Sequence, residues 1–289
     1  MQPPQILAGL SEAADHYDVL LCDVWGVIHN GREAFPEACA ALKRFRETRG
    51  PVIMISNSPR LAEGVAVQMR DLGVPDDCWS ALVTSGDATR SELAARAPGP
   101  VWAVGPVRDA PLYEGLGVVF AETPEEAAFV CCTGLFDDEV ETPEDFRSRL
   151  QAAAARDLLM VCANPDRVVQ RGDRLIYCAG ALADLYQALG GRVTMAGKPY
   201  APIYGYAYAE AERLLGRPLD KARILAIGDG APTDVRGAQE QGLDCLFIAS
   251  GIHGAESVGP DGQLSASLAA AVLAHEGASA RYASLALRW

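Results

Sequence analysis

Four short segments of the chain contain the residue types that chemistry on a phosphate group requires. They are Asp23-Val24-Trp25-Gly26-Val27, Ser56-Asn57-Ser58, Gly197-Lys198-Pro199 and Gly228-Asp229-Gly230, with Asp234 five residues beyond Asp229. Transfer of a phosphoryl group through a covalent intermediate needs an anionic nucleophile, a metal ion that offsets negative charge, and donors for the phosphoryl oxygens. Aspartates, a lysine and a serine can supply these functions, so the segments predict a phosphoryl-transfer site.

Apolar runs end directly before three of these segments. The runs, each with the residue that follows it, are 19–22 with Asp23, 52–55 with Ser56, and 223–227 with Gly228. Helix-like stretches such as 36–48 separate the runs, a pattern typical of βαβ units. Parallel sheets built from such units are covered by helices on both faces and bind ligands at the carboxyl ends of their strands. We therefore expect an α/β fold with a doubly wound parallel sheet.

The stretch between Ser56 and Lys198 is too long to be a connection. It covers about 140 residues, whereas loops in α/β units usually have about 2 to 6. It also contains strand-like runs of its own, at 101–104, 117–120, 128–132 and 158–162. The sequence therefore predicts an inserted α/β domain. We place this domain at residues 87–190 and the core at residues 1–86 and 191–289.

In their order and spacing, the four segments resemble the motifs of the haloacid dehalogenase-like (HAD) hydrolases. The resemblance is to subclass IIA, the NagD-like and p-nitrophenyl-phosphatase-like enzymes, and it spans nearly the whole chain. It implies a Rossmann-like HAD core with an inserted C2-type cap that closes over the active site. Residues 163–166 and 178–182 look like the second half of this cap. The implied activity is Mg²⁺-dependent hydrolysis of a small phosphate monoester through an aspartyl-phosphate intermediate.

The resemblance also implies a role for each matching residue. Asp23 would be the nucleophile, and Gly26 would let backbone amides approach the anion. The phosphoryl group would be held by Ser56, Asn57 and Lys198. The metal ligands would be the carboxylates of Asp23 and Asp229 and the backbone carbonyl of Trp25, with Asp234 either as a further ligand or as a group that supports the ligands. Alternatives remain at two positions, because Asp23 could be a turn residue and Asp234 could cap the helix that follows it.

Trp25 departs from the family pattern, which has a second aspartate at this position. That aspartate protonates the leaving oxygen and then activates water, and tryptophan can do neither. His29 or His253 could substitute, because imidazole titrates near neutral pH. Alternatively, the substrate could have a good leaving group, or the protein could be a catalytically impaired phosphate-ligand binder or regulator. The Trp25 ring itself could pack between core and cap, or stack on a ring of the ligand.

The composition limits the class of partner and the compartment. At 289 residues the chain is long for one core, and its net charge of −13 argues against binding to nucleic acid. Its eight cysteines form no CxxC pair and are expected to be reduced thiols. No signal-like start or run of about 18 apolar residues is present, which predicts a cytoplasmic protein without a membrane segment.

Three further alternatives follow from the sequence. The Gly228–Pro232 stretch resembles a dinucleotide loop only weakly, because its third glycine is missing and an aspartate lies between the first two. A phosphotransferase would use the same residues as a phosphatase but would pass the phosphoryl group to an alcohol. Apolar surfaces on the inserted domain could support a homodimer, although no interface is visible in the sequence.

Overall fold

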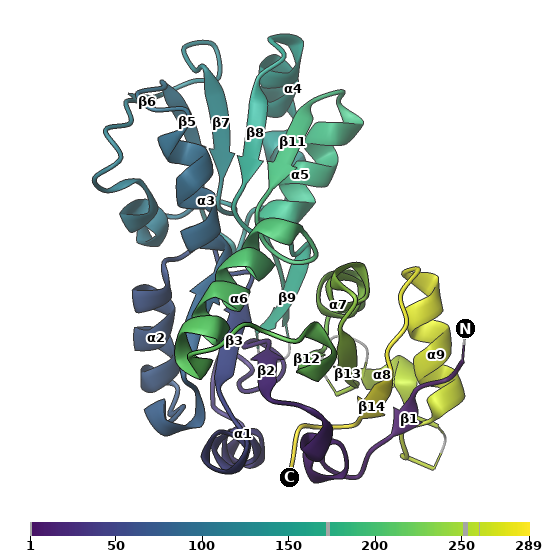
Figure 1. Ribbon diagram of the computed structural model, residues 1–289. Coiled ribbons are helices and arrows are strands. Elements are labelled where there is room, and N and C mark those ends of the chain that lie inside the picture. Colours follow the sequence, from purple (N-terminus) through teal and green to yellow (C-terminus); the bar gives the residue numbers. More distant parts are fainter. Residues whose placement is uncertain (1, 172–173, 251–253, 260) are drawn as a thin grey trace.

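In a computed structural model of the chain, two parallel sheets lie one above the other (Figure 1). The structure describes residues 2–171, 174–250, 254–259 and 261–289. The sheet with seven strands lies below in this view, near both termini, and the sheet with five strands lies above it. The α/β fold with a doubly wound parallel core, predicted from the sequence, is confirmed.

The larger sheet carries the motif segments of the core. Its strand order is β1-β14-β13-β12-β2-β3-β4, and every neighbouring pair is parallel. The strands are β1 (Gln5–Ile6), β2 (Val19–Cys22), β3 (Val52–Ser56), β4 (Ala81–Thr84), β12 (Ile224–Gly228), β13 (Asp244–Ile248) and β14 (Tyr282–Ser284). Because β2 lies between β12 and β3, the carboxyl ends of these three strands open side by side at one edge.

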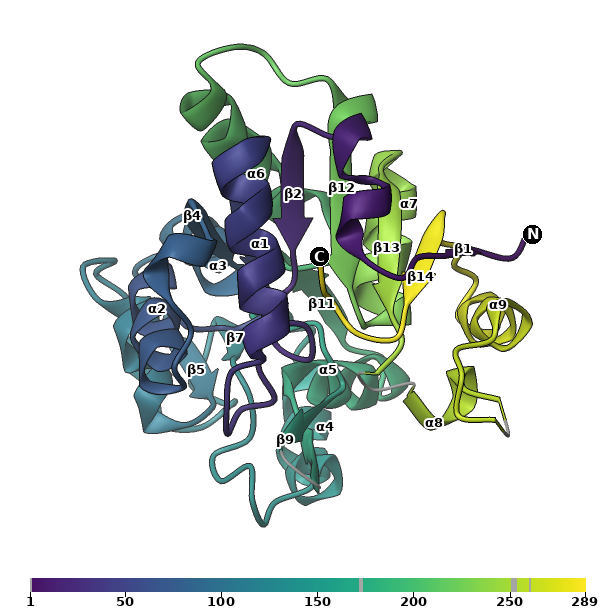
Figure 2. The same cartoon turned by 90° about the horizontal axis from the view of Figure 1, so that it is seen from below.

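Helices cover both faces of this sheet. On one face lie α1 (Pro36–Thr48) and α2 (Ala62–Asp71), and on the other lie α6 (Ala201–Leu215), α7 (Arg236–Gln241) and α9 (Ala266–His275). A short helix, α8 (Gly254–Ser257), precedes α9. Figure 2, seen from below, shows α1 beside β2.

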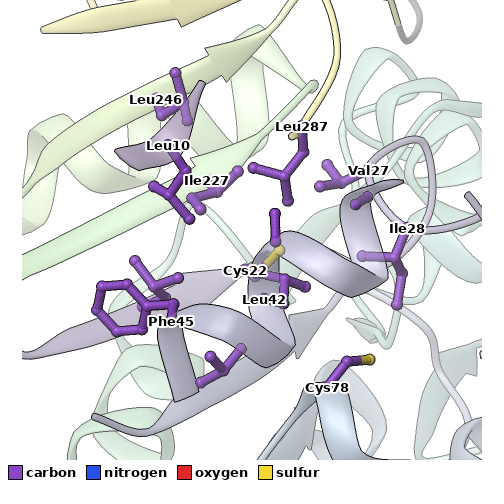
Figure 3. Close-up of a cluster of buried hydrophobic side chains, with 14 of the residues drawn as sticks. Leu10, Cys22, Val27, Ile28, Leu42, Phe45, Cys78, Ile227, Leu246 and Leu287 are labelled. Carbon is purple, nitrogen blue, oxygen red and sulfur yellow. The ribbon is translucent and has the colours of Figure 1, made fainter. Parts of the chain in front are cut away.

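The buried face of α1 shows why this helix forms where it does. Its buried positions are Ala38, Cys39, Ala41, Leu42 and Phe45, a spacing that places them on one side of an α-helix. Leu42 and Phe45 belong to the same apolar cluster as Cys22 of β2 (Figure 3). This packing fixes β2, and with it the residue that follows β2, against a well-filled core.

The smaller sheet has the order β11-β8-β7-β5-β6 and is also parallel. Its strands are β5 (Val101–Val104), β6 (Phe120–Ala121), β7 (Phe129–Cys132), β8 (Leu159–Cys162) and β11 (Arg192–Met195). Helices α3 (Ser85–Ala94), α4 (Arg147–Ala155) and α5 (Ala179–Ala188) accompany this sheet. An antiparallel pair, β9 (Val168–Arg171) with β10 (Arg174–Tyr177), stands apart from both sheets in the hydrogen-bond pattern.

The division at residues 87 and 190 remains a prediction, and the elements do not end at those positions. Helix α3 runs across residue 87, and β11 continues the smaller sheet to Met195. The strand expected at 117–120 is reduced to the two residues of β6, because Gly117 has φ +67° and interrupts the extended backbone. All eight cysteines are buried free thiols, as the sequence predicts. Among the described residues, no helix is long and apolar enough to cross a membrane.

Candidate active site

The ends of adjacent strands bring the motif residues together. Asp23 directly follows β2, Ser56 is the last residue of β3, and Asp229 directly follows β12. The backbone N–H of Asp23 still donates to the Ile227 carbonyl of β12, at 2.8 Å, so the sheet holds this aspartate in place. The three side chains are buried, although all three are polar. Buried polar groups need partners, so the contacts of these residues define the site.

Lys198 supplies the central contact. Its Nζ donates to Asp23 Oδ1 and to Asp234 Oδ1, both at 2.6 Å, and only 2% of the residue is exposed. Burial alone would lower the pKa of Lys198, but the carboxylates of Asp23, Asp234 and Asp166 outweigh it and raise this pKa well above its usual value. Lys198 is therefore a permanent cation facing the nucleophile that the sequence predicts.

Asp234 is held by its own turn. It lies in a short π-helical turn, Ala231–Val235, where its backbone N–H donates to the Gly230 carbonyl at 2.8 Å. Its Oδ2 accepts the N–H of Gly230 at 3.0 Å, while its Oδ1 faces Lys198. The next helix, α7, begins at Arg236 and receives no side-chain cap. The alternative role of Asp234, as the cap of that helix, is therefore not observed.

Asn57 fixes the loop that carries Lys198. Asn57 Oδ1 accepts the backbone N–H of Lys198 at 2.7 Å, and Asn57 Nδ2 donates to the Lys198 carbonyl at 3.1 Å. The same Nδ2 also donates to Asp166 Oδ1 at 2.9 Å. A Cβ on Gly197 would lie 2.7 Å from Asn57 Oδ1, so only glycine permits this approach. The loop of Ser56, the loop of Lys198 and the segment of Asp166 thus form one hydrogen-bonded unit.

Ser56 is oriented by the residue two positions later. Its Oγ accepts the N–H of Ser58 at 3.2 Å, and the residue is 6% exposed. Because this bond uses a lone pair of the hydroxyl, the O–H hydrogen remains available for an anion.

Three carboxylates form a pocket suited to a divalent cation. One oxygen from each of Asp23, Asp229 and Asp234 lies within 4.8 Å of the other two, and all three residues are buried. Hard oxygen donors of this kind match the preference of Mg²⁺. Burial raises the pKa of Asp23, and Lys198 partly counters this effect. A metal ion would relieve the remaining repulsion between the carboxylates. The backbone carbonyl of Trp25, the fourth expected ligand, remains a prediction.

Gly26 lies against the Asp229 carboxylate, and its part in phosphate binding remains a prediction. Its N–H donates to the His29 carbonyl at 2.8 Å, so this amide already has a partner and is not free for a phosphate. Its φ is +86°, and a Cβ at this position would lie 2.2 Å from Asp229 Oδ2. Gly26 therefore makes room for the Asp229 carboxylate, which the metal pocket requires.

Family models and a solved crystal structure are similar to this chain in sequence and fold. A family model described as haloacid dehalogenase-like hydrolase matches residues 20–119, and a HAD hydrolase-like model matches residues 195–271. The crystal structure of a haloacid dehalogenase-like family hydrolase from Brucella suis 1330 is 46% identical, covers 98% of this chain and 100% of its own, and has a TM-score of 0.87. The chain belongs to the haloacid dehalogenase-like hydrolase family.

Other relatives of this HAD hydrolase are more distant. The D-glycerol 3-phosphate phosphatase of Mycobacterium tuberculosis is 26% identical over 85% of this chain and 67% of its own length. The 5'-nucleotidase YutF of Bacillus subtilis is 25% identical over 85% of this chain and 92% of its own length. A crystal structure of the mycobacterial glycerol phosphate phosphatase in complex with calcium has a TM-score of 0.62 and covers 83% of this chain and 68% of that chain. The subclass IIA resemblance is confirmed.

Trp25 connects the loop that follows β2 to strand β9. Its Nε1 donates to the carbonyl of Gln170 in β9 at 2.5 Å. Its ring meets His29 edge to face, with 5.1 Å between ring centroids, and packs closely against Gly31. Of the alternatives for Trp25, packing rather than stacking on a ligand agrees with these contacts, because the ring lies between its own loop and β9.

His29, a predicted substitute for the missing acid, is nearly inaccessible. It is 2% exposed, and its Nδ1 accepts the N–H of Gly31 at 3.1 Å. Burial lowers the pKa of His29 to about 4, so the ring is neutral near pH 7 and has little ability to donate or accept a proton. His253, the other predicted substitute, lies outside the described residues.

A cavity of about 730 Å³ adjoins residues of all four motif segments, among them Asp23, Ser56, Lys198 and Asp229. Residues that follow strands of the larger sheet line one side, and described residues from 108–109, 133–135, 138, 164–171 and 176–178 line the rest. Asp166 and the side chain of Asn57 are the site residues whose contacts sequence reasoning missed. The segment 163–166 had a signal, because an Asn-Pro-Asp sequence directly follows an apolar run.

Proposed function

We propose that this HAD hydrolase is a Mg²⁺-dependent phosphatase that hydrolyses a small phosphate monoester through an aspartyl-phosphate on Asp23. The observation that carries the proposal is the position of Lys198 Nζ, 2.6 Å from both Asp23 and Asp234. A buried cation between a nucleophile and a metal-binding carboxylate suits a substrate with concentrated negative charge. The names of two relatives, a D-glycerol 3-phosphate phosphatase and a 5'-nucleotidase, agree with this assignment.

Each residue has a defined task in the proposed reaction. The Asp23 carboxylate attacks phosphorus, and the bond between phosphorus and the leaving oxygen breaks. Lys198, the Ser56 hydroxyl and the Asn57 backbone amide donate to the phosphoryl oxygens. Bound Mg²⁺, held by Asp23, Asp229 and Asp234, would offset the negative charge gathered at the site. Water then attacks the phosphoryl group and releases inorganic phosphate and free Asp23.

The inserted domain, proposed at residues 87–190, would act as the cap that selects the substrate. It supplies most of the wall opposite Asp23, in a cavity of about 730 Å³, which suits a small-molecule phosphate. Closure of such a cap would exclude water from the reaction. The eight buried free thiols agree with a reducing compartment, and we propose the cytoplasm.

The decisive test is the Mg²⁺-dependent hydrolysis of p-nitrophenyl phosphate and of glycerol phosphate by wild type and Asp23→Asn. The proposal expects turnover by wild type on at least one ester, loss on chelation of Mg²⁺, and loss in Asp23→Asn. It is contradicted if wild type cleaves neither ester, or if Asp23→Asn keeps the wild-type rate.

One observation favours a second candidate, a binder or regulator that keeps the fold without efficient turnover. Trp25 occupies the position of the usual acid and is engaged by the carbonyl of Gln170. Calorimetric titration with inorganic phosphate and Mg²⁺, combined with the absence of turnover, would support this candidate. The retained pair of Asp23 and Lys198 argues against it, because a binder has no need of a nucleophile.

A further inference from the structure

The segment that follows β8 places one more carboxyl group in the active-site cavity. Asp166 lines the cavity and is only partly buried. Its Oδ1 accepts the Nδ2 hydrogen of Asn57 at 2.9 Å, and its backbone N–H donates to Asn164 Oδ1 at 3.0 Å. Among the described residues, no hydrogen bond reaches its Oδ2. One oxygen is therefore anchored, and the other is available to a ligand.

The charged groups around Asp166 are those of the reaction centre. Asp23, Lys198 and Asp234 all interact with it electrostatically, and the buried thiols of Cys162 and Cys178 also lie within the influence of its charge. Burial raises the pKa of Asp166 to about 6, while Lys198 and the bond from Asn57 act in the opposite direction. A carboxyl group with this pKa exchanges protons near neutral pH, as general acid–base catalysis requires.

The other carboxyl groups of the cavity wall are less suitable. Asp138 is partly buried, but its ion pairs with Arg171 and Arg108 hold its pKa below the usual value. The Oδ1 of Asp109 is fully enclosed and has no hydrogen-bond partner among the described residues. Glu33 lies on an exposed turn. Among these carboxyl groups of the cavity, Asp166 is the one that bonds to Asn57, the neighbour of Ser56 in the predicted phosphate-binding loop.

We propose that Asp166 is the general acid and base of this enzyme and takes the role that Trp25 cannot fill. The inference rests on the proposed phosphatase function. As the bond between Asp23 and phosphorus forms, the bond from phosphorus to the leaving oxygen breaks, and the Asp166 proton passes to that oxygen to give an alcohol. The Asp166 carboxylate then takes a proton from water while the water oxygen bonds to phosphorus. The bond between phosphorus and Asp23 breaks in the same step, which restores both side chains.

Asp166 and Asp23 come from segments that are far apart in the sequence. Asp166 lies in the inserted segment, whereas Asp23 and Ser56 lie at the ends of core strands. The proton donor and the nucleophile would therefore meet only when the two sheets are docked as they are in this structure. Asn57 bonds to both Lys198 and Asp166, so it would couple the packing of the two sheets to the position of the phosphate-binding loop.

The test compares Asp166→Asn with wild type on glycerol phosphate and p-nitrophenyl phosphate. The asparagine keeps an oxygen that can accept from Asn57 but has no acidic proton. We expect kcat/KM on glycerol phosphate to fall by about 10²- to 10⁴-fold, because an alkoxide leaves poorly without protonation. We expect kcat/KM on p-nitrophenyl phosphate to stay within about fivefold, since nitrophenolate needs no proton to leave. A stoichiometric burst of p-nitrophenol should precede slow turnover, because the base for the second step is missing.

Two controls separate this role from a purely positional one. Asp184→Asn changes a surface carboxylate of the inserted domain that pairs with Arg167, and it should leave both rates unchanged. If Asp166 only positions Asn57, Asp166→Asn should behave as wild type and Asp166→Ala should lose activity equally on both esters. That result would overturn the inference. So would a loss of kcat/KM in Asp166→Asn that is equal on the two esters, with the melting temperature unchanged. If wild type cleaves neither ester, the phosphatase function fails as well, which is a distinguishable result.

Discussion

The side-chain amide of Asn57 brackets the backbone of Lys198 from both sides. Its Oδ1 accepts the Lys198 N–H at 2.7 Å, and its Nδ2 donates to the Lys198 carbonyl at 3.1 Å. Neither bond involves the Lys198 ammonium, but together they fix the backbone from which the Lys198 side chain extends. The precise position of the ammonium between Asp23 and Asp234 therefore depends on a residue 141 positions away in the chain.

Replacement of Asn57 by alanine should impair catalysis more than it impairs folding. The variant removes both bonds to the Lys198 backbone and the bond to Asp166, so the ammonium loses its fixed starting point. Misplacement of a catalytic group by about 1 Å can cost about 100-fold in rate, and we expect a loss of that size in kcat on p-nitrophenyl phosphate. Asn30→Ala, which alters a surface turn at the cavity rim, is the matched control. A rate for Asn57→Ala within threefold of wild type would contradict the expectation.

Lys198 should matter for stability as well as for rate. Lys198→Met leaves the buried carboxylates of Asp23 and Asp234 without their cation, and removal of one partner from a buried ion pair typically costs about 3–5 kcal/mol. Mg²⁺ should recover part of this loss, because it supplies positive charge to the same oxygens. Thermal unfolding with and without Mg²⁺ measures both effects. Lys221→Met, which removes an exposed lysine that lies over Tyr208, should show neither a large loss nor a changed response to Mg²⁺.

The core of the site could be predicted from the sequence because its geometry follows from strand order. Buried parallel strands are continuous apolar runs, so their ends are visible in the sequence, and β12, β2 and β3 are neighbours in the sheet. Residues at those ends, such as Asp23 and Asp229, must then lie close together. Lys198 does not follow a strand of the larger sheet, so its place in the site could be predicted only from the family resemblance.

The remaining contacts depend on side-chain directions and on the packing of one sheet over the other. Asp166 meets Asn57 across 109 residues of sequence, and Trp25 meets Gln170 across 145. No local sequence pattern predicts the direction of a side-chain amide or the way the smaller sheet packs over the larger one. The contact of Gly26 with Asp229 could not be predicted for the same reason, since it depends on how the two loops pack.

Asp18 should give the enzyme a pH-dependent contribution to stability. Ion pairs with Arg223 and Arg217, each at 2.6 Å, outweigh burial and lower the pKa of Asp18. A lowered pKa in the folded state means that the stabilisation is present above the unfolded pKa, about 3.9, and is lost as the pH falls through the folded value. Asp18→Asn should therefore lower the free energy of unfolding by about 1 kcal/mol near neutral pH.

Thermal unfolding of Asp18→Asn and wild type between pH 7 and about pH 2 tests this prediction. The difference in melting temperature should shrink toward the acid end, because both proteins then lack the ion pairs. Asp71→Asn, at an exposed carboxylate at the end of α2, is the control and should show no such trend. A difference between Asp18→Asn and wild type that stays constant with pH would mean that the ion pairs contribute nothing.

Gly26 should be required for the metal pocket rather than for the turn alone. Gly26→Ala places a Cβ 2.2 Å from Asp229 Oδ2, so the carboxylate must move away from Asp23 and Asp234. Gly73 has almost the same backbone angle, φ +88° against +86°, but open space around its Cβ position. Both alanine variants should lose about 1–2 kcal/mol from backbone strain, and only Gly26→Ala should also lose the rise in melting temperature on addition of Mg²⁺. Equal Mg²⁺ responses in the two variants would show that Asp229 does not help to bind the metal.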